Sequence, residues 1–165
     1  IGERFDQGKA FVPNLLLAAR AMKGCLEILK PRLQNASETS LGTLVIGTVK
    51  GDLHDIGKNL VASMLEGCGF EVINLGVDIS DSQFVDAVRK YNPQIVCLSA
   101  LLTTTMSYMK EVIDTLANEG LRQKVKVLVG GAPVSEEFAI QIGADGYSSN
   151  ANGAVILAKR ILGKC

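Results

Sequence analysis

The chain contains only one histidine among 165 residues, no tryptophan and few other aromatic side chains. Few aromatic rings argue against a surface that stacks carbohydrate or single-stranded nucleic acid. Lysine plus arginine equals aspartate plus glutamate at 17 each, so no net charge favours nucleic acid or an anionic membrane as a partner. The longest apolar runs are too short to span a bilayer. Composition and charge therefore favour no particular class of ligand, and the function is expected to depend on individual residues and their spacing.

The four cysteines, Cys25, Cys68, Cys97 and Cys165, form no CxxC pair and no zinc-ligand spacing. Cys97 lies in an apolar run and is predicted to be a buried side chain. Scattered, reduced thiols are typical of a cytoplasmic protein, which is the localisation we expect. The sequence also lacks GxGxxG after the first predicted strand and GxxxxGK[ST] anywhere, so neither standard phosphate-binding fingerprint is present.

The N-terminal segment, residues 1–34, is predicted to be helical, with a break at Pro13 and an end near Pro31. The chain enters this pattern in the middle of a helix, so we expect a helical cap that forms the C-terminal part of a bundle. A polar linker is predicted at 35–42, and a second domain at 43–165.

From residue 43 onward, short apolar runs alternate with helical segments. This alternation predicts an α/β fold: a doubly wound, mostly parallel five-stranded sheet of Rossmann-like or flavodoxin-like type, with helices on both faces. The expected strands are 43–49, 71–75, 94–99, 125–130 and 144–148, and the expected helices are 56–67, 81–91, 105–119, 135–142 and 152–162.

Three loops of small residues follow predicted strands at 50–57, 99–105 and 130–133. Such sheets bind ligands beyond the carboxyl ends of their strands, at the topological switch point. Glycine at a strand end is common in any one turn, but three such loops at one edge predict a deep and narrow slot. The small residues are Gly51, Gly57, Ser99, Ala100, Gly130, Gly131 and Ala132.

The single histidine, His54, lies in the run Gly51-Asp52-Leu53-His54-Asp55-Ile56-Gly57. One imidazole nitrogen can bind a metal while the other donates to Asp52, which fixes the tautomer. One histidine cannot build a metal site alone, so this interpretation needs a metallocofactor with its own equatorial ligands. The alternative is a structural turn histidine bonded to Asp52. A metal phosphohydrolase is excluded because it would need further histidines.

These residues resemble a known family. The run from Gly51 to Gly57, followed by Ser99-Ala100-Leu101 and then Gly130-Gly131, is similar to the DxHxxG, SxL and GG signature of cobalamin-binding domains. The upstream run Gly8-Lys9-Ala10-Phe11-Val12-Pro13 resembles the helical cap of cobalamin-dependent methionine synthase and of the corrinoid proteins of methyltransferase systems. The resemblance covers essentially the whole chain and implies cobalamin or a related corrinoid, and hence cobalt.

The resemblance also implies roles for individual residues. His54 is the expected lower axial ligand to cobalt in place of the cofactor's dimethylbenzimidazole, and Asp52 the partner of its far nitrogen. Thr105 stands where the family has a serine that completes this triad. Ser99 is expected to contact the nucleotide tail, and Thr103 to lie near the tail or the corrin ring. The remaining expected contacts are Gly51, Leu53, Asp55, Ile56, Gly57, Leu101, Gly130, Gly131, Ala132 and Ala151, with Phe11 either over the upper face of the corrin or in the core of the cap.

The implied function is that of a methyl carrier without catalysis of its own. A substrate:corrinoid methyltransferase would load the methyl group, a second methyltransferase would pass it to a thiol or folate-type acceptor, and a reductive activator would be a further partner. Two alternatives stay open on the residues alone. One is a regulatory or adenosylcobalamin-mutase-type domain, and the other is a flavin- or nucleotide-binding domain in which His54 is structural.

Overall fold

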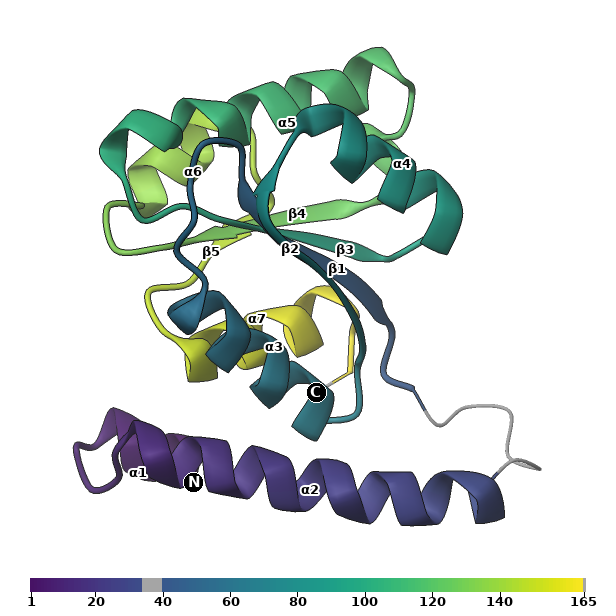
Figure 1. Ribbon diagram of the computed structural model, residues 1–165, viewed down its shortest axis with the longest axis vertical. Helices are drawn as coiled ribbons and strands as arrows, with labels where there is room; N and C mark the ends of the chain where they lie inside the picture. Colours follow the sequence, from purple (N-terminus) through teal and green to yellow (C-terminus); the bar gives the residue numbers. More distant parts are fainter. Residues whose placement is uncertain (34–39, 165) are drawn as a thin grey trace.

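The structure is a computed structural model that describes residues 1–33 and 40–164 (Figure 1). Most of the predicted linker at 35–42, and also Cys165, lie outside the described residues. The first part of the chain is helical, and the second forms a sheet with helices on both faces.

Five parallel strands form one sheet in the order β2-β1-β3-β4-β5, which confirms the predicted doubly wound fold. The central strands are rich in valine, leucine and isoleucine because helices cover both of their faces. The chain reverses its direction of winding between β1 and β3, and the switch point therefore lies there. The strands are β1 (Thr43–Val49), β2 (Glu71–Ile79), β3 (Ile95–Ser99), β4 (Lys126–Gly130) and β5 (Gly146–Tyr147).

The helices of the α/β part lie in two layers. One face of the sheet carries α4, α5 and α6, and the other carries α3 and α7 (Figure 1). Each layer closes its own apolar core against the sheet. The bounds are α3 (Ile56–Gly67), α4 (Asp81–Tyr91), α5 (Ser107–Asn118), α6 (Glu136–Ile142) and α7 (Ala151–Ile161), with 3₁₀ turns η1 (Thr103–Thr105) and η2 (Arg122–Lys124).

The helical cap, residues 1–33, consists of α1 (Gly2–Asp6) and α2 (Val12–Leu33) and lies against α3 and α7, away from the sheet (Figure 1). Leu15 and Ala19 of α2 are buried in the core that α3 and α7 share. A Cβ atom on Gly67 of α3 would lie 3.0 Å from the Cα atom of Ala19, so glycine allows the two helices to approach closely.

Of the two prolines of the cap, only Pro13 differs from the prediction, because the helix does end close to Pro31. The break lies between α1 and α2, before Pro13, which instead occupies the first turn of α2. A proline is tolerated there because the first N–H groups of a helix have no intrahelical partner. Pro31 lies within the last turn, and the helix ends at Leu33.

Strand β2 is longer than the predicted 71–75 and runs to Ile79. Its pairing with β1 shifts register twice, between Ile46 and Gly47 and between Gly47 and Val49. Gly76 and Asp78 have positive φ values of 94° and 55°, which the alternation of apolar residues could not reveal. The predicted helix 105–119 is likewise split into η1 and α5, and β5 is shorter than predicted, whereas the other bounds agree within a residue.

Candidate functional site

Asp52 lies at the centre of the site, in the loop that follows β1. Its carboxylate is fully buried and accepts hydrogen bonds on both oxygens. Oδ1 accepts from the backbone N–H of His54 at 3.0 Å and from His54 Nδ1 at 2.8 Å. Oδ2 accepts from the N–H groups of Leu101 and Leu102 at 2.7 and 3.2 Å and from Thr105 Oγ1 at 2.9 Å. One side chain therefore joins the loops after β1 and β3.

The hydrogen bond to Asp52 fixes the tautomer of the neutral imidazole of His54. Burial by itself would raise the pKa of the Asp52 carboxyl, but the donors from His54, Leu101 and Thr105 outweigh it and hold the pKa well below its usual range. An ionised carboxylate only accepts, so His54 Nδ1 carries the proton of this bond. The lone pair of the neutral ring is then on Nε2, on a side chain that is 51% exposed. This atom is available to a metal.

Thr105, the predicted third member of the triad, is buried beside Asp52. The 3₁₀ turn η1 places its hydroxyl within hydrogen-bond distance of the carboxylate. The backbone of His54 is held from the other side, because Thr48 Oγ1 at the end of β1 donates to the His54 carbonyl at 2.9 Å. The imidazole thus projects from a loop whose backbone is fixed by buried polar groups.

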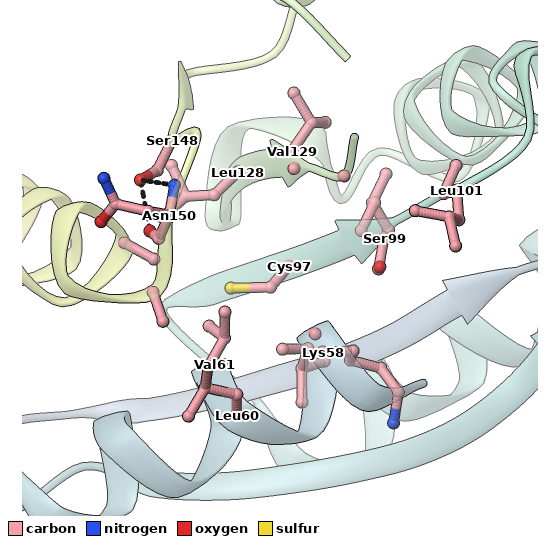
Figure 2. A pocket seen from close by; sticks show the side chains of 18 of the residues that line it. Lys58, Leu60, Val61, Cys97, Ser99, Leu101, Leu128, Val129, Ser148 and Asn150 are labelled. Carbon is pink, nitrogen blue, oxygen red and sulfur yellow. Dashed lines mark hydrogen bonds between the residues drawn. The ribbon is translucent and has the colours of Figure 1, made fainter. Parts of the chain in front are cut away.

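A cavity of about 550 Å³ extends from His54 between α3, α7 and the ends of β3 and β4. Figure 2 shows side chains from these elements around it, with Lys58, Leu60 and Val61 on one side and Leu128, Ser148 and Asn150 opposite. The predicted residues that line it are Leu53, His54, Asp55, Ile56, Gly57, Ser99, Leu101, Gly130, Gly131, Ala132 and Ala151.

Five predicted site residues do not line the cavity. Asp52 and Thr105 lie behind the histidine, where they hold it. A Cβ atom on Gly51 would face Thr105 and Tyr108, and Thr103 is exposed. Phe11 is 71% exposed, whereas Phe5 of α1 lines the cavity.

Sequence reasoning missed the apolar wall of the cavity, which comes from the inner faces of α3 and α7 and from side chains of β3 and β4. Cys97 of β3 points into the cavity (Figure 2), and burial raises the pKa of its thiol to about 12, so it is neither a thiolate ligand nor a nucleophile at neutral pH. The helical periodicity of 56–67 was the available signal for this wall. Its further members are Leu60, Val61, Leu65, Leu128, Leu157 and Ala158.

Lys58 is a buried cation at the rim of this wall. Its Nζ donates to Asn59 Oδ1 at 2.8 Å and to Asn74 Oδ1 at 2.7 Å. Burial lowers the pKa of Lys58, and the carboxylate of Asp55 opposes that shift. These bonds tie the first turn of α3 to β2.

These residues fit a corrinoid bound through His54. Leu53 and Ile56, on either side of the histidine, are 71% and 86% exposed, an apolar surface that suits a large flat ligand. A Cβ atom on Gly57 would meet nothing within 4 Å, so this glycine leaves room in the cavity. In the described ranges 1–33 and 40–164, no three His, Cys, Asp or Glu side chains are grouped to hold a metal ion, and a metal at His54 therefore has to bring its other ligands.

Comparison with known proteins agrees with this fit. Two family models, each described as a B12 binding domain, match residues 42–156 and 1–30. Trimethylamine corrinoid protein 2 of Methanosarcina mazei is 46% identical over 98% of this chain and 75% of its own length. Dimethylamine corrinoid protein 3 of the same organism is 45% identical over 98% of both chains.

Solved structures are similar over the whole chain. A cobalamin-binding protein from Desulfitobacterium hafniense has a TM-score of 0.84 and 43% identity, over 96% of this chain and 75% of its own. A methanol:cobalamin methyltransferase complex from Methanosarcina barkeri has a TM-score of 0.84 and 35% identity, over 99% of this chain and 62% of its own. No helix among the described residues is long and apolar enough to cross a membrane. The chain belongs to the B12-binding family of corrinoid proteins.

Proposed function

We propose that the chain carries a methyl group on the cobalt of a corrinoid between two methyltransferases, with His54 as the lower axial ligand. The observation that carries the proposal is the Asp52–His54 pair, in which a buried carboxylate directs the free Nε2 of the chain's only histidine outward beside a long cavity. When bound, the corrinoid would supply a cobalt centre that takes up and releases a methyl group.

The chain's own residues would bind and orient this cofactor. The apolar wall between α3 and α7 and the small residues at the ends of β3 and β4 suit the displaced nucleotide tail. Asp52 keeps the proton of the imidazole on Nδ1 and thereby raises the basicity of Nε2. Thr105 and the N–H groups of Leu101 and Leu102 keep that carboxylate ionised.

The partners follow from the same chemistry. We expect a substrate-specific methyltransferase to load the methyl group, and the names of the curated relatives favour a methylamine as its source. A second methyltransferase would pass the group to a thiol or folate-type acceptor. A reductive activator would reduce cobalt that had become oxidised in a side reaction. We place this exchange in the cytoplasm, in keeping with the free thiols of Cys25, Cys68 and Cys97.

The first experiment is electron paramagnetic resonance of the cobalt(II) form, reconstituted with cobalamin and prepared without a histidine tag. Because the chain contains a single histidine, a nitrogen-15 histidine label reports on His54 alone. We expect a splitting that changes with the label. A retained cobalt signal that ignores the label would overturn the role of His54.

A matched variant separates ligation from folding. His54→Gln removes the imidazole from a half-exposed position, so the apolar cavity and the fold should persist. Because the variant contains no histidine, its readout is affinity, and it is expected to retain cobalamin more weakly than the wild type. Cobalamin affinity equal to that of the wild type would contradict the proposal.

A further inference from the structure

We propose that Asp78, at the irregular end of β2, is a positioning residue that fixes the backbone of the His54 loop (residues 50–57) and so directs the lower ligand. This inference rests on the proposed function, because it assigns to Asp78 a task only if His54 binds cobalt. Asp78 is exposed and does not line the cavity, and none of the family motifs includes it.

The path of β2 brings Asp78 to the loop. Between its pairings with Ile46 and Val49 of β1, β2 contains two more residues than its partner strand. Extra residues in one strand of a pair, as in a β-bulge, bend that strand and redirect its side chains, often beside functional sites. With Gly76 and Asp78 at positive φ, the end of β2 turns over the start of the His54 loop.

Asp78 makes two hydrogen bonds of opposite sense to this loop. Its Oδ1 accepts from the N–H of Gly51 at 2.7 Å, and its own N–H donates to the carbonyl of Asp52 at 3.0 Å. The main chain of 51–52 is therefore held by Asp78, while the Asp52 side chain is held by the loop after β3. The loop that carries Asp52 and His54 is therefore held from both neighbours of β1.

The conformation of Asp78 indicates that these bonds matter. A left-handed conformation is uncommon for a residue other than glycine, although aspartate and asparagine tolerate it best. The other described case is Asn92, at φ 45°, and it ends helix α4, where that conformation is common. Asp78 ends no helix. Its left-handed conformation has an energetic cost, which its two hydrogen bonds to the His54 loop offset.

Three variants separate the acceptor oxygen from the backbone conformation. Asp78→Gly keeps the left-handed backbone accessible but removes the acceptor, whereas Asp78→Asn keeps a side-chain oxygen and tolerates the same backbone. Asn92→Gly is the matched control, because it makes the same kind of change at the end of α4, far from the loop in sequence. Thermal unfolding of each cofactor-free variant shows the temperature range in which it is folded.

The first readout needs no cofactor. Amide hydrogen exchange at Gly51 is expected to be about tenfold faster or more in Asp78→Gly, because its N–H loses its side-chain acceptor. Asp78→Asn and Asn92→Gly should leave it within about threefold of the wild-type rate. Unchanged exchange in Asp78→Gly, or an equal change in Asn92→Gly, would overturn the proposal.

The second readout is the fraction of cobalt(II) protein whose spectrum shows the histidine nitrogen. This fraction is expected to fall in Asp78→Gly and to recover in Asp78→Asn, with Asn92→Gly like the wild type. A merely structural role would lower the unfolding temperature and leave the fraction unchanged. If the wild type itself lacks the label-dependent splitting, the proposed function fails, and the Gly51 exchange still decides whether Asp78 fixes the loop.

Discussion

The His54 loop and the helical cap both border the cavity, but they are held by opposite means. The loop is fixed by buried polar groups, because the buried Asp52 carboxylate accepts five hydrogen bonds from the loops after β1 and β3. Among its described side chains, the cap is held mainly by the apolar contacts of Leu15 and Ala19 against α3 and α7, while Leu17 and Ile28 are 66% and 72% exposed. The site therefore has one side held by buried polar groups, which set its geometry, and one side held by apolar packing.

Removal of the Asp52 carboxylate should give the largest effect, because it leaves several buried donors without an acceptor. Asp52→Ala is expected to lower the free energy of unfolding by about 3 kcal/mol or more in the cofactor-free protein, measured by urea denaturation. Asp52→Asn, which keeps two polar atoms in place, should cost less. A loss of unfolding free energy below about 1 kcal/mol in Asp52→Ala would contradict the difference between loop and cap, since the loop would then not depend on its polar groups.

Truncation of the cap contact should have a smaller and more local effect. Leu15 is 1% exposed, and Leu15→Ala is expected to weaken the packing of α2 by about 2 kcal/mol. Hydrogen exchange should then accelerate in α2 while the sheet stays protected. Leu16→Ala is the matched control, because the side chain of Leu16, next to Leu15 in the sequence, is 44% exposed. Equal acceleration throughout the sheet would show that cap and sheet unfold together.

A polar cluster that does not line the cavity tests whether a partly buried carboxylate stabilises the fold as the fully buried Asp52 does. Burial would raise the pKa of Asp145, but the Val127 N–H, Lys126 and Arg122 lower it overall. Its stabilisation is therefore present above the ordinary aspartate pKa of about 3.9 and is lost as the pH falls through the lower folded-state value.

The matching variant is Asp145→Asn. It should cost about 1 kcal/mol at pH 7, a modest value because the group is partly solvated, and the difference from the wild type should shrink below about pH 4. Urea denaturation at the two pH values measures it, and cobalamin retention should not change. A difference that grows on acidification would show the opposite sign and refute the assignment.

The smallest effect on stability is expected at Phe11. The side chain is 71% exposed, so Phe11→Ala should change the free energy of unfolding by no more than about 0.5 kcal/mol. If Phe11 covers the upper face of the corrin, as the family resemblance implies, the variant should lose its methyl group faster under light. Leu17→Ala, at a comparably exposed position, is the control. Identical photolysis rates in all three proteins would assign Phe11 to the surface of the cap.

The sequence predicts the sheet and the His54 loop far better than the surroundings of the loop. The alternation of apolar runs and helical segments was sufficient for the sheet, since parallel strands covered on both faces are apolar throughout. The spacing of Asp52 and His54 predicted their contact because both lie in one short loop. Thr105, some fifty residues further on, needed the family resemblance, because no local pattern shows which hydroxyl meets a distant carboxylate.

What sequence reasoning missed depends on tertiary contacts. The bulges that extend β2 and bring Asp78 to Gly51 have no periodic signature. The wall residues of α3 and α7 were predicted as helical, but which faces of these helices line a cavity depends on how α3 and α7 pack. Phe5, not Phe11, lines the cavity because the cap breaks before Pro13 and folds α1 back toward α7.

The way in which Asp52 joins two loops has a consequence for protein design. If the His54 loop alone were transferred into another five-stranded parallel sheet, Asp52 Oδ1 would keep its local donors from His54. Asp52 Oδ2 would lose all of its donors, which come from Leu101, Leu102 and Thr105. The smallest portable unit is therefore discontinuous and comprises both loops in their present spacing. A transplant of this kind should be designed as a pair from the start.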